Sequence, residues 1–404
     1  MSAANHTSVS LAEICSLITD GKHGDCEPDD NSGFYFLSCK DVNNGKLNYH
    51  GARQITEVDF HDTHRRTRLE PGDILLTNSG TIGRMAIAPK HELTKRTTFQ
   101  KSVAILKPLH EEVDSRFLYY ALHGELPRLI EFAGGTAQKN LLLRDLRGFC
   151  LQLPDLPTQR KIAGILSAYD DLIENNLRRI KILEQMAQSL YREWFIHFRF
   201  PGHESARFID SSLGRIPKGW EVRKILDFAD VIYGFSFKAN RFNTAGEGVP
   251  VVRIRNIQDG KSETYSEEEG DPKHRIKNGD ILVGMDGDFH MTIWSGGDAW
   301  QNQRVAKFHP KGAMGNYLLF LTLEKPIHFF DSTITGTTVA HLGDSHIKTI
   351  EFASPPEFLM TKASDLLEPM ALEQLNLRRR NQTLRRTRDL LLPKLLQNDP
   401  LPEF

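Results

Sequence analysis

A long stretch in the middle of the chain carries a regular pattern of apolar positions. From Pro157 to about Phe198, these positions recur in alternating steps of four and three, the mean spacing of a coiled-coil seam. The seam positions are Ile162, Leu166, Tyr169, Ile173, Asn176, Ile180, Leu183, Ala187, Leu190 and Trp194. Only Asn176 is strongly polar, and an asparagine in such a seam fixes helix register at some cost in stability. The pattern predicts one long helix that packs along another helix.

The end of the chain carries a second, more polar helical pattern. One column at heptad spacing is apolar: Met370, Leu377, Leu384 and Leu391. The other column is polar: Gln374, Asn381 and Arg388. These polar positions could face either the first helix or a helix of a partner protein. We expect Pro369 to kink this helix or to mark the start of its regular part, and Pro393 to disturb its last turn. Two such helices separated by a domain pair most simply antiparallel, as a rod of roughly 60 Å.

Two globular regions accompany the helices. Residues 8–152 read as a mixed α/β unit whose short apolar runs predict strands, separated by Gly and Asn clusters: Phe34–Leu37, Asp73–Leu76 and Val103–Leu106. Residues 115–132 predict a helix followed by a second helical piece. A polar connector, PGHESARFIDSSLGRIPKGW, leads into a second α/β unit over roughly 219–353.

The two halves of the chain repeat each other. Five short segments recur in the same order about 200 residues apart: 40–46 with 255–261, 69–80 with 276–287, 103–108 with 305–310, 135–141 with 336–342, and 175–180 with 375–380. Because the order is kept, we infer a duplicated unit of one globular domain followed by one long helix. The predicted fold is α+β, with two globular α/β domains joined by two long antiparallel helices (a coiled coil) and an internal pseudo-two-fold repeat. The expected boundaries are 1–155, 156–199, 200–355 and 356–404.

Composition narrows the possible partners and compartment. The 404 residues suffice for two to three domains, and the net charge is −1, so a DNA-binding surface must be a local patch or be shared with a partner. No apolar run reaches the roughly 18 residues that span a membrane, and we see no signal peptide. The four cysteines show no C-x-x-C spacing. We therefore expect a reduced, cytoplasmic protein without a disulfide framework or zinc site.

No motif for catalysis, nucleotide binding or metal binding by this chain is complete in the sequence. Ser354-Pro355-Pro356-Glu357 lacks the aromatic residue of a methyltransferase tetrad, so we interpret it as a helix entry. A P-loop ending at Gly260 would need glycine where Arg255 stands. His61 and His64 have no further ligand nearby in sequence. The recurring G-D-I-L, with Asp73 and Asp280, indicates a turn entering a buried strand rather than catalytic carboxylates.

The chain resembles the specificity (S) subunit of type I restriction–modification systems. LPDLPTQRKIAGIL (153–166) resembles the first conserved region of that family, and RTRDLLLPKLL (386–396) resembles the end of the second. PGDILLTNSGTIG (71–83) and GTAQKNLLLRDL (135–146) resemble recurring text of its target-recognition domains. The resemblance covers essentially the whole chain. The second half departs at 355–369 and has Asp286-Gly287-Asp288-Phe289-His290 where the first has Ser79-Gly80-Thr81-Ile82-Gly83, so the two domains should read different half-sites.

The resemblance implies a bipartite DNA-recognition subunit that itself catalyses nothing. Each globular domain would read one half of a split double-stranded DNA target, the second half inverted. The helices would set the spacing, about one helical turn or roughly 10 bp centre to centre, and would bind two methyltransferase (M) subunits. Restriction/translocase (R) subunits would complete an adenine DNA methyltransferase and ATP-dependent endonuclease. S-adenosylmethionine would then belong to the M subunits and ATP with Mg to the R subunits, with no cofactor and no metal on this chain.

Residue type selects candidates for DNA contact, since Arg and Lys read guanine, Asn and Gln read adenine, and all of these with Ser and Thr hold phosphates. In the first unit the candidates are Lys22, His23, Ser79, Thr81, Arg84, Arg96, Gln100, Lys101, Gln138, Lys139 and Asn140. In the second they are Tyr233, Lys238, Arg241, Asp286, Asp288, His290, Trp300, Gln301, Asn302, Gln303 and Arg304. The segment 300–304, WQNQR, is the densest such cluster. A solvated surface role remains the alternative for each of these residues.

Two other interpretations stay open. The chain could be a stand-alone methyltransferase or nuclease with an unrecognised site, or a coiled-coil scaffold without a DNA role. The arginine-rich end of the second helix, Arg378 to Arg388, could bind DNA, although a solvated face or pairing with acidic partner helices is the simpler interpretation.

Overall fold

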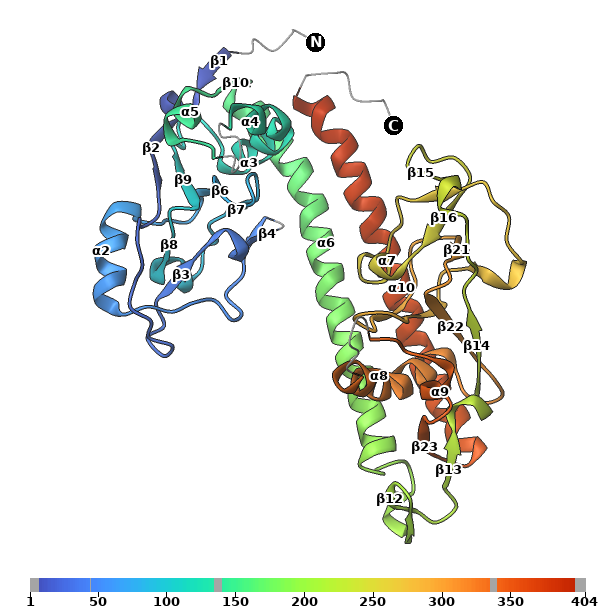
Figure 1. The fold of residues 1–404 in the computed structure, drawn as a ribbon. Coiled ribbons are helices and arrows are strands. Elements are labelled where there is room, and N and C mark those ends of the chain that lie inside the picture. The colour runs from blue at the N-terminus through green and yellow to red at the C-terminus, as the bar shows by residue number, and fades with distance from the viewer. Residues whose placement is uncertain (1–6, 44, 134–139, 335–339, 397–404) are drawn as a thin grey trace. The chain divides into compact units, whose positions relative to one another are not determined.

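The chain forms two compact units that share both long helices. The computed structural model describes residues 7–43, 45–133, 140–334 and 340–396. The first unit comprises Met1–Leu172 with Leu384–Phe404, and the second comprises Ile173–Thr383. Helix α6 (Leu156–Tyr191) and helix α10 (Glu357–Leu396) therefore each contribute one part to each unit (Figure 1).

The first unit is built on a four-stranded antiparallel sheet of order β2-β9-β6-β7. The central strands β6 (Ile74–Thr77) and β9 (Val103–Pro108) are buried along their whole length, in keeping with the apolar runs Ile74–Leu76 and Val103–Leu106. The remaining strands are β1 (Thr7–Ser10), β2 (Cys15–Asp20), β3 (Tyr35–Leu37), β4 (Val42–Asn43), β5 (Lys46–Leu47), β7 (Met85–Ile87), β8 (Thr97–Phe99) and β10 (Cys150–Leu153). The helices are α1 (Leu11–Ile14), α2 (Glu57–Thr67), α3 (Ser115–Gly124), α4 (Leu126–Phe132) and α5 (Leu143–Gly148).

The second unit repeats this topology. Its four-stranded antiparallel sheet has the order β14-β22-β19-β20. The strands are β11 (Phe208–Ser211), β12 (Gly214–Pro217), β13 (Glu221–Lys224), β14 (Ala229–Tyr233), β15 (Phe242–Asn243), β16 (Val249–Val252), β17 (Tyr265–Ser266), β18 (Arg275–Ile276), β19 (Ile281–Gly284), β20 (Met291–Ile293), β21 (Ala299–Gln301), β22 (Val305–Pro310) and β23 (Glu351–Ser354). The helices are α7 (Ile254–Asp259), α8 (Asn316–Thr333) and α9 (Asp344–Ile347).

The correspondence between the units extends to strand pairing. The parallel pair β3–β8 matches β16–β21, and the antiparallel pair β1–β10 matches β13–β23. Ile74 lies opposite Leu106 in the first sheet, as Ile281 lies opposite Phe308 in the second. The predicted duplication and the three predicted strands of the first unit are thus confirmed. The helical segment at 115–132 divides into α3 and α4, whereas its counterpart α8 continues through Pro326.

The repeated G-D-I-L has the structural role that its sequence predicts. Asp73 accepts a hydrogen bond from the Glu70 amide at 2.8 Å and from the buried Lys107 amine at 2.7 Å. Asp280 accepts the Lys277 amide in the same way, at 2.8 Å, and its carboxylate lies 3.8 Å from the Lys307 amine. In both units the aspartate closes a turn and neutralises a buried lysine, which accounts for its recurrence without any catalytic role.

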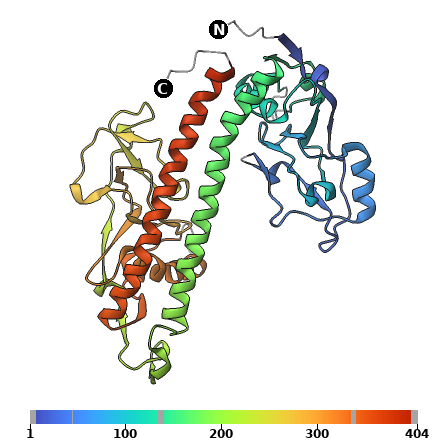
Figure 2. The same ribbon diagram turned by 180° about the vertical axis from the view of Figure 1, so that it is seen from behind.

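Helices α6 and α10 pack side by side and antiparallel (Figure 2). In the second unit, Asn176 bonds to Asn381 and Arg179 pairs with Glu373, so numbering rises along one helix as it falls along the other. The seam predicted for α6 is buried or half-buried at every position. Its ends face the globular cores rather than only the other helix, since Leu166 joins the core of the first unit and Trp194 joins that of the second.

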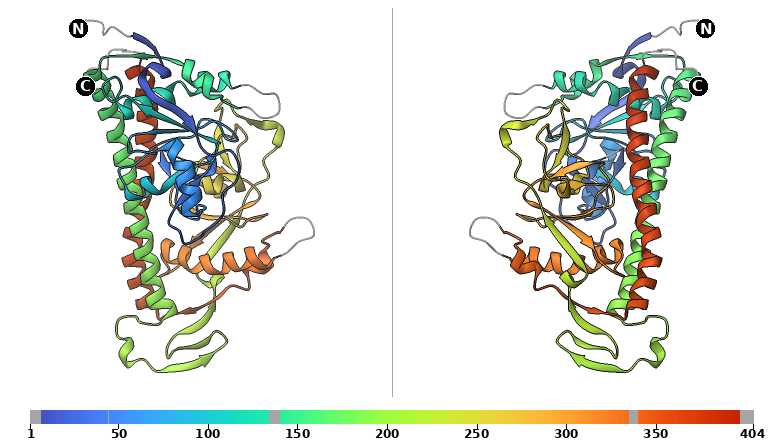
Figure 3. Two further views of the ribbon diagram at one scale, coloured as in Figure 1. Left: turned by 90° about the vertical axis from the view of Figure 1, so that its left-hand side faces the viewer. Right: turned by 90° about the vertical axis from the view of Figure 1, so that its right-hand side faces the viewer.

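The polar column of α10 is satisfied within the chain. Gln374 donates to the Tyr317 hydroxyl of α8 at 2.8 Å, and α8 runs crosswise to the long helices (Figure 3). In the first unit, Arg388 of α10 pairs with Asp170 of α6. Contacts inside the protein therefore explain Gln374, Asn381 and Arg388 without a partner helix.

The ends of the helices differ in part from the sequence prediction. The regular part of α6 ends at Tyr191, and a π-helical turn, Arg192–Ile196, follows. Helix α10 begins at Glu357, immediately after Pro355 and Pro356, so Pro369 does not mark its start. The helix also continues past Pro393 to Leu396, and a disturbance of the last turn at this proline stays a prediction.

Candidate nucleic-acid interface

In the first unit, loops from separate strands meet at one end of the four-stranded sheet. The end of β6, the start of β9 and the end of β2 all lie there because these strands are antiparallel. The Asn78 amide donates to the Ser102 carbonyl at 3.0 Å, and the Lys101 amide donates to the Lys22 carbonyl at 3.1 Å. Asn140 forms a β-bridge with Ser79. We call residues 21–23, 78–84, 100–102 and 140 the first loop cluster.

The second unit builds the same arrangement with different side chains. The Met285 amide donates to the Arg304 carbonyl at 3.0 Å, matching the Asn78–Ser102 bond of the first unit. The Leu342 amide donates to Met285 at 2.7 Å, as Leu141 donates to Asn78 at 2.9 Å. We call residues 234–236, 285–290, 302–304 and 341 the second loop cluster. The two clusters share a backbone scaffold and differ in what they expose.

A glycine at one position of each cluster makes this scaffold possible. A Cβ on Gly21 would lie 1.9 Å from the Phe99 carbonyl oxygen, and a Cβ on Gly234 would lie 1.9 Å from that of Asn302. No side chain fits such an approach of one backbone to another. The sequence analysis missed both residues, although each is a glycine that directly follows a strand in its half of the chain.

Eight of the first-unit candidates gather in the first loop cluster with exposed or half-buried side chains: Lys22, His23, Ser79, Thr81, Arg84, Gln100, Lys101 and Asn140. Arg96 lies elsewhere, at the end of the 3-10 turn Glu92–Arg96, where its guanidinium stacks over Phe34. Gln138 and Lys139 lie outside the described residues. Lys101 is the exposed cation of the first loop cluster for which we find no acidic partner among the described residues.

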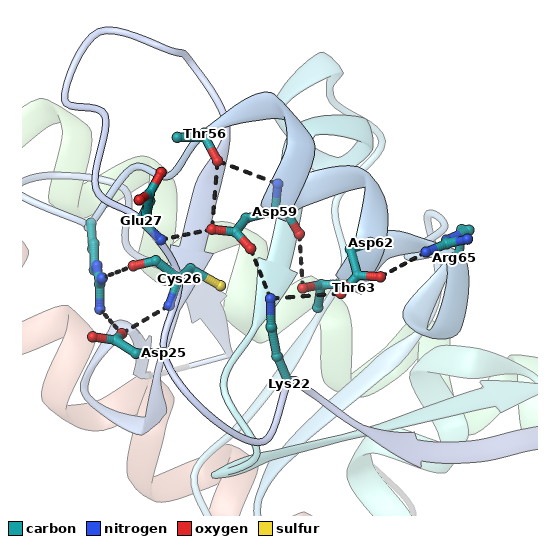
Figure 4. Close-up of polar contacts among 10 residues, drawn as sticks. Lys22, Asp25, Cys26, Glu27, Thr56, Asp59, Asp62, Thr63 and Arg65 are labelled. Carbon is teal, nitrogen blue, oxygen red and sulfur yellow. Dashed lines mark hydrogen bonds and ion pairs between the residues drawn. The ribbon is translucent and has the colours of Figure 1, made fainter.

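Lys22 is in the first loop cluster but its charge is already neutralised. Its amine lies 2.8 Å from Asp59 and 3.6 Å from Asp62, both on α2 (Figure 4). The hydrogen bond from Lys22 is the largest cause that holds the pKa of Asp59 below its usual value. His23 similarly lies 3.0 Å from Asp20. Both basic side chains therefore contact carboxylates of the same unit and stabilise the loop. This leaves them less available to bind a phosphate.

In the second unit, the second loop cluster brings together Asp286, Asp288, His290, Asn302, Gln303 and Arg304. Lys238 and Arg241 are exposed at a separate 3-10 turn, Ala239–Arg241. Tyr233 donates its hydroxyl to Asp344 at 2.9 Å, and desolvation followed by this carboxylate raises the pKa of the phenol. That hydroxyl is engaged, so Tyr233 is better described as a support of α9.

Trp300 and Gln301 are a correction to the sequence analysis. Both lie on β21 and are buried, with 3% and 0% of their surface exposed. The indole of Trp300 packs among Phe237 and Val251, and Gln301 donates from Nε2 to the carbonyls of Ile232 and Val305, each at 2.7 Å. Neither side chain can contact a base in this conformation. Of the WQNQR segment, Asn302, Gln303 and Arg304 remain at the surface.

Other chemistry finds no support in the described parts of the chain. Within them, no group of three or more His, Cys, Asp and Glu side chains could hold a metal ion. His64 stacks on Phe60, and Gly260 ends α7 with a positive φ of 66°. Among these same residues, no helix is long and apolar enough to cross a membrane.

Two arginines of α10 form ion pairs with acidic residues of α6. Arg378 lies 2.7 Å from Glu184 of α6 in the second unit, and Arg388 contacts Asp170 in the first. Their partners are the acidic residues of the neighbouring helix in the same chain. These two guanidinium groups are therefore part of the helix pair.

These features define a class of protein with two similar α/β domains, each presenting a loop cluster, and a shared antiparallel helix pair. The chain belongs to the family of the type I restriction modification DNA specificity domain, which matches residues 5–185 and again 217–358. It is thus a DNA specificity subunit of type I restriction–modification, and membership in this family supports a non-catalytic role.

Individual relatives agree over most of the chain. The MjaIX specificity subunit of Methanocaldococcus jannaschii is 27% identical over 89% of this chain and 85% of its own length. The HindI specificity subunit of Haemophilus influenzae is 21% identical over 90% and 94%. The crystal structure of a type I S subunit from M. genitalium superposes with a TM-score of 0.63 at 15% identity, covering 100% of this chain and 98% of that one. This structural likeness supports the fold.

Proposed function

We propose that the chain reads a bipartite DNA target, with one half-site at each loop cluster. The observation that carries this proposal is that the two clusters share backbone hydrogen bonds but expose different side chains. A common scaffold with variable polar side chains suits direct reading of base edges in the major groove. Because the exposed sets differ, the two half-sites should differ in sequence.

We further propose that the chain acts within a complex of two M subunits and R subunits. The net charge of −1 favours shared DNA binding, since affinity for the duplex depends on cations that neutralise phosphates. In that complex, adenine methylation would use S-adenosylmethionine on the M subunits, and ATP-dependent cleavage would use the R subunits. This chain would supply the sequence selection and, through α6 and α10, the spacing between half-sites.

Methylation mapping of host DNA with and without this chain tests the proposal directly. We expect a split motif that disappears when the chain is deleted. Lys101→Ala should then relax only one half of the motif, and Gln303→Ala only the other, which assigns each half to a unit. A motif that both substitutions leave unchanged would favour a scaffold role. Methyl transfer or cleavage by the purified chain alone would instead favour an independent enzyme.

The spacing role has its own test. Insertion of one helical turn into both α6 and α10 adds about 5.4 Å to each helix. We expect the preferred spacer of the motif to lengthen while both half-site sequences stay the same. An unchanged spacer in a stable variant would contradict a measuring role for the helices.

A further inference from the structure

Arg304 of the second loop cluster forms an ion pair with Asp286, and the carboxylate of Asp286 also contacts His341. The Nε of Arg304 lies 3.1 Å from Oδ2 of Asp286, and Nδ1 of His341 lies 2.6 Å from Oδ1 of the same carboxylate. Asp286 is 25% exposed and Arg304 is 50% exposed at the side chain. Because the ion pair is made at Nε, the edge of the guanidinium that carries Nη1 and Nη2 is the one left to face a ligand.

The backbone fixes all three residues. The Arg304 carbonyl accepts from the Met285 amide at 3.0 Å, immediately before Asp286, and Asp286 forms an antiparallel β-bridge with His341. The three side chains come from three separate segments, the loop after β19, the loop before β22 and the strand-like residue before α9. Their arrangement is therefore set by the fold of the unit and not by one flexible loop.

Among the described residues, the matching positions of the first loop cluster form no such ion pair. The same backbone contacts there join Asn78 to Ser102 and Ser79 to Asn140. Ser79, Ser102 and Asn140 thus occupy the places of Asp286, Arg304 and His341, and none of them is charged. At these three matched positions only the second unit carries an ion-paired cation, which indicates a difference in what the two units recognise.

We propose that Arg304 reads a guanine of the half-site recognised by the second unit, and that Asp286 and His341 are its positioning residues. The inference rests on the proposed function. Arginine contacts guanine O6 and N7 through two parallel N–H groups, and this is the commonest base-specific contact in the major groove. Fixing the guanidinium in advance lowers the conformational entropy lost on binding.

The carboxylate also argues against a phosphate contact. Asp286 places a negative charge beside Arg304, and Asp288 adds another in the same loop, 79% exposed at its side chain. Both would repel a phosphate at that position, whereas the uncharged acceptors of guanine are not repelled in this way. A cation partly neutralised by its neighbours is suited to selecting a base and poorly suited to nonspecific attraction.

The test uses the chain assembled with its methyltransferase subunits and synthetic duplexes that carry the mapped motif. Arg304→Ala should weaken binding to the cognate duplex by roughly tenfold to a hundredfold and abolish discrimination at one G·C pair of a single half-site. Replacing that guanine with 7-deazaguanine, which lacks N7, should weaken the wild-type complex but not the Arg304→Ala complex. Ser102→Ala, at the matching place in the first unit, is the control. It should leave discrimination at the second unit's half-site unchanged.

Two further variants separate base reading from charge and from folding. Arg304→Lys keeps the charge but not the planar fork, so it should retain binding to unrelated DNA while losing discrimination at the same base pair. Asp286→Asn should lose part of that discrimination while binding unrelated DNA more tightly, because a repulsive charge is removed. A purely structural role for Asp286 would not produce both changes together.

The outcomes that overturn the inference are distinct from failure of the proposed function. A wild-type complex without a split motif would refute the proposed function itself. A split motif with no guanine in the second unit's half-site, or one that Arg304→Ala and Arg304→Lys both leave intact, would refute only the role of Arg304. Equal weakening on every DNA sequence by Arg304→Ala, with full discrimination retained, would assign Arg304 to phosphate and also overturn the inference.

Discussion

Asn176 on α6 donates a hydrogen bond from Nδ2 to Oδ1 of Asn381 on α10, over 2.8 Å. Both side chains are buried, at 8% and 2% exposure, and Asn381 also donates to the Ile173 carbonyl at 3.4 Å. Only one register of the two helices lets these amides meet. The polar pair therefore specifies alignment in a seam that is otherwise apolar on α6, as a buried asparagine does in coiled coils.

We predict that Asn176→Leu destabilises the protein by about 1–3 kcal/mol, because it leaves the buried Asn381 amide without its partner. Asn176→Leu with Asn381→Leu should recover much of this loss, since both polar groups are then replaced. Denaturant unfolding of the single and double variants measures both. Asn175→Leu, an exposed neighbour, is the control and should change the free energy of unfolding by less than about 0.5 kcal/mol. An equally large effect at Asn175 would contradict the assignment.

Gly21→Ala and Gly234→Ala should each destabilise their unit by about 1–3 kcal/mol, because the new Cβ would meet a backbone carbonyl that cannot easily move. Gly164→Ala is the matched control. It lies inside α6 with open space around its Cβ position, so we expect about 0.5–1 kcal/mol of stabilisation. Thermal unfolding compares the three variants, and hydrogen exchange at 100–102 and 302–304 should increase only in the corresponding loop-cluster variants.

Gln301 and Gln303 should separate stability from recognition. Gln301→Ala removes two buried hydrogen bonds and should cost about 1–3 kcal/mol while leaving the methylated motif intact in the folded fraction. Gln303→Ala should change stability by less than about 0.5 kcal/mol, because the side chain is exposed, and should relax the motif. If a stable Gln301→Ala variant lost DNA sequence selectivity, Gln301 would have to be counted among the residues that recognise DNA.

Stability should fall as the pH drops below about 6.5. Burial is the main cause that lowers the pKa of His274 in the second unit and of His64 in the first. The unfolded chain then binds more protons than the folded one between the lowered pKa and 6.5, so the free energy of unfolding decreases as the pH falls through that window. Each histidine can contribute at most about 1.4 kcal/mol per pH unit.

His274→Gln and His64→Gln should each reduce this slope in pH-dependent urea unfolding. His50, which is exposed, provides the control substitution and should leave the slope unchanged. A slope that neither buried-histidine variant alters would show that other groups, such as paired carboxylates, account for the loss of stability in acid.

The long-range order of the chain was largely predictable from sequence because it repeats. Five short matches at one offset identified the duplication, and the 3.5-residue spacing identified α6. Asn176 stood out as polar in its seam, but its partner did not. Asn381 belongs to a column with Gln374 and Arg388, and nothing local distinguishes a residue that bonds across the helix pair from one that faces a partner protein.

The candidate interface was predicted less well, and the errors have physical causes. Gln301 has a side chain that can read a base, yet its amide donates hydrogen bonds to two backbone carbonyls, one from β14 and one from β22. Lys22 looks like a phosphate ligand until α2 brings Asp59 to it from 37 residues away. Residue type shows what a side chain can bind. Only the fold shows whether its hydrogen-bonding groups or its charge are already paired within the protein.

The last turns of α10 complete the core of the first unit, where Leu392 and Leu395 pack with residues such as Leu122 and Leu166. The core of the first unit therefore cannot close until Leu392 and Leu395, which follow the whole second unit in the sequence, have been made. A protein truncated near its C-terminus would expose the apolar core of its first unit, although every loop of that unit had been translated. Folding of the first domain is thus tied to synthesis of the second, and a chain interrupted before Leu392 should not persist as a DNA reader of one half-site.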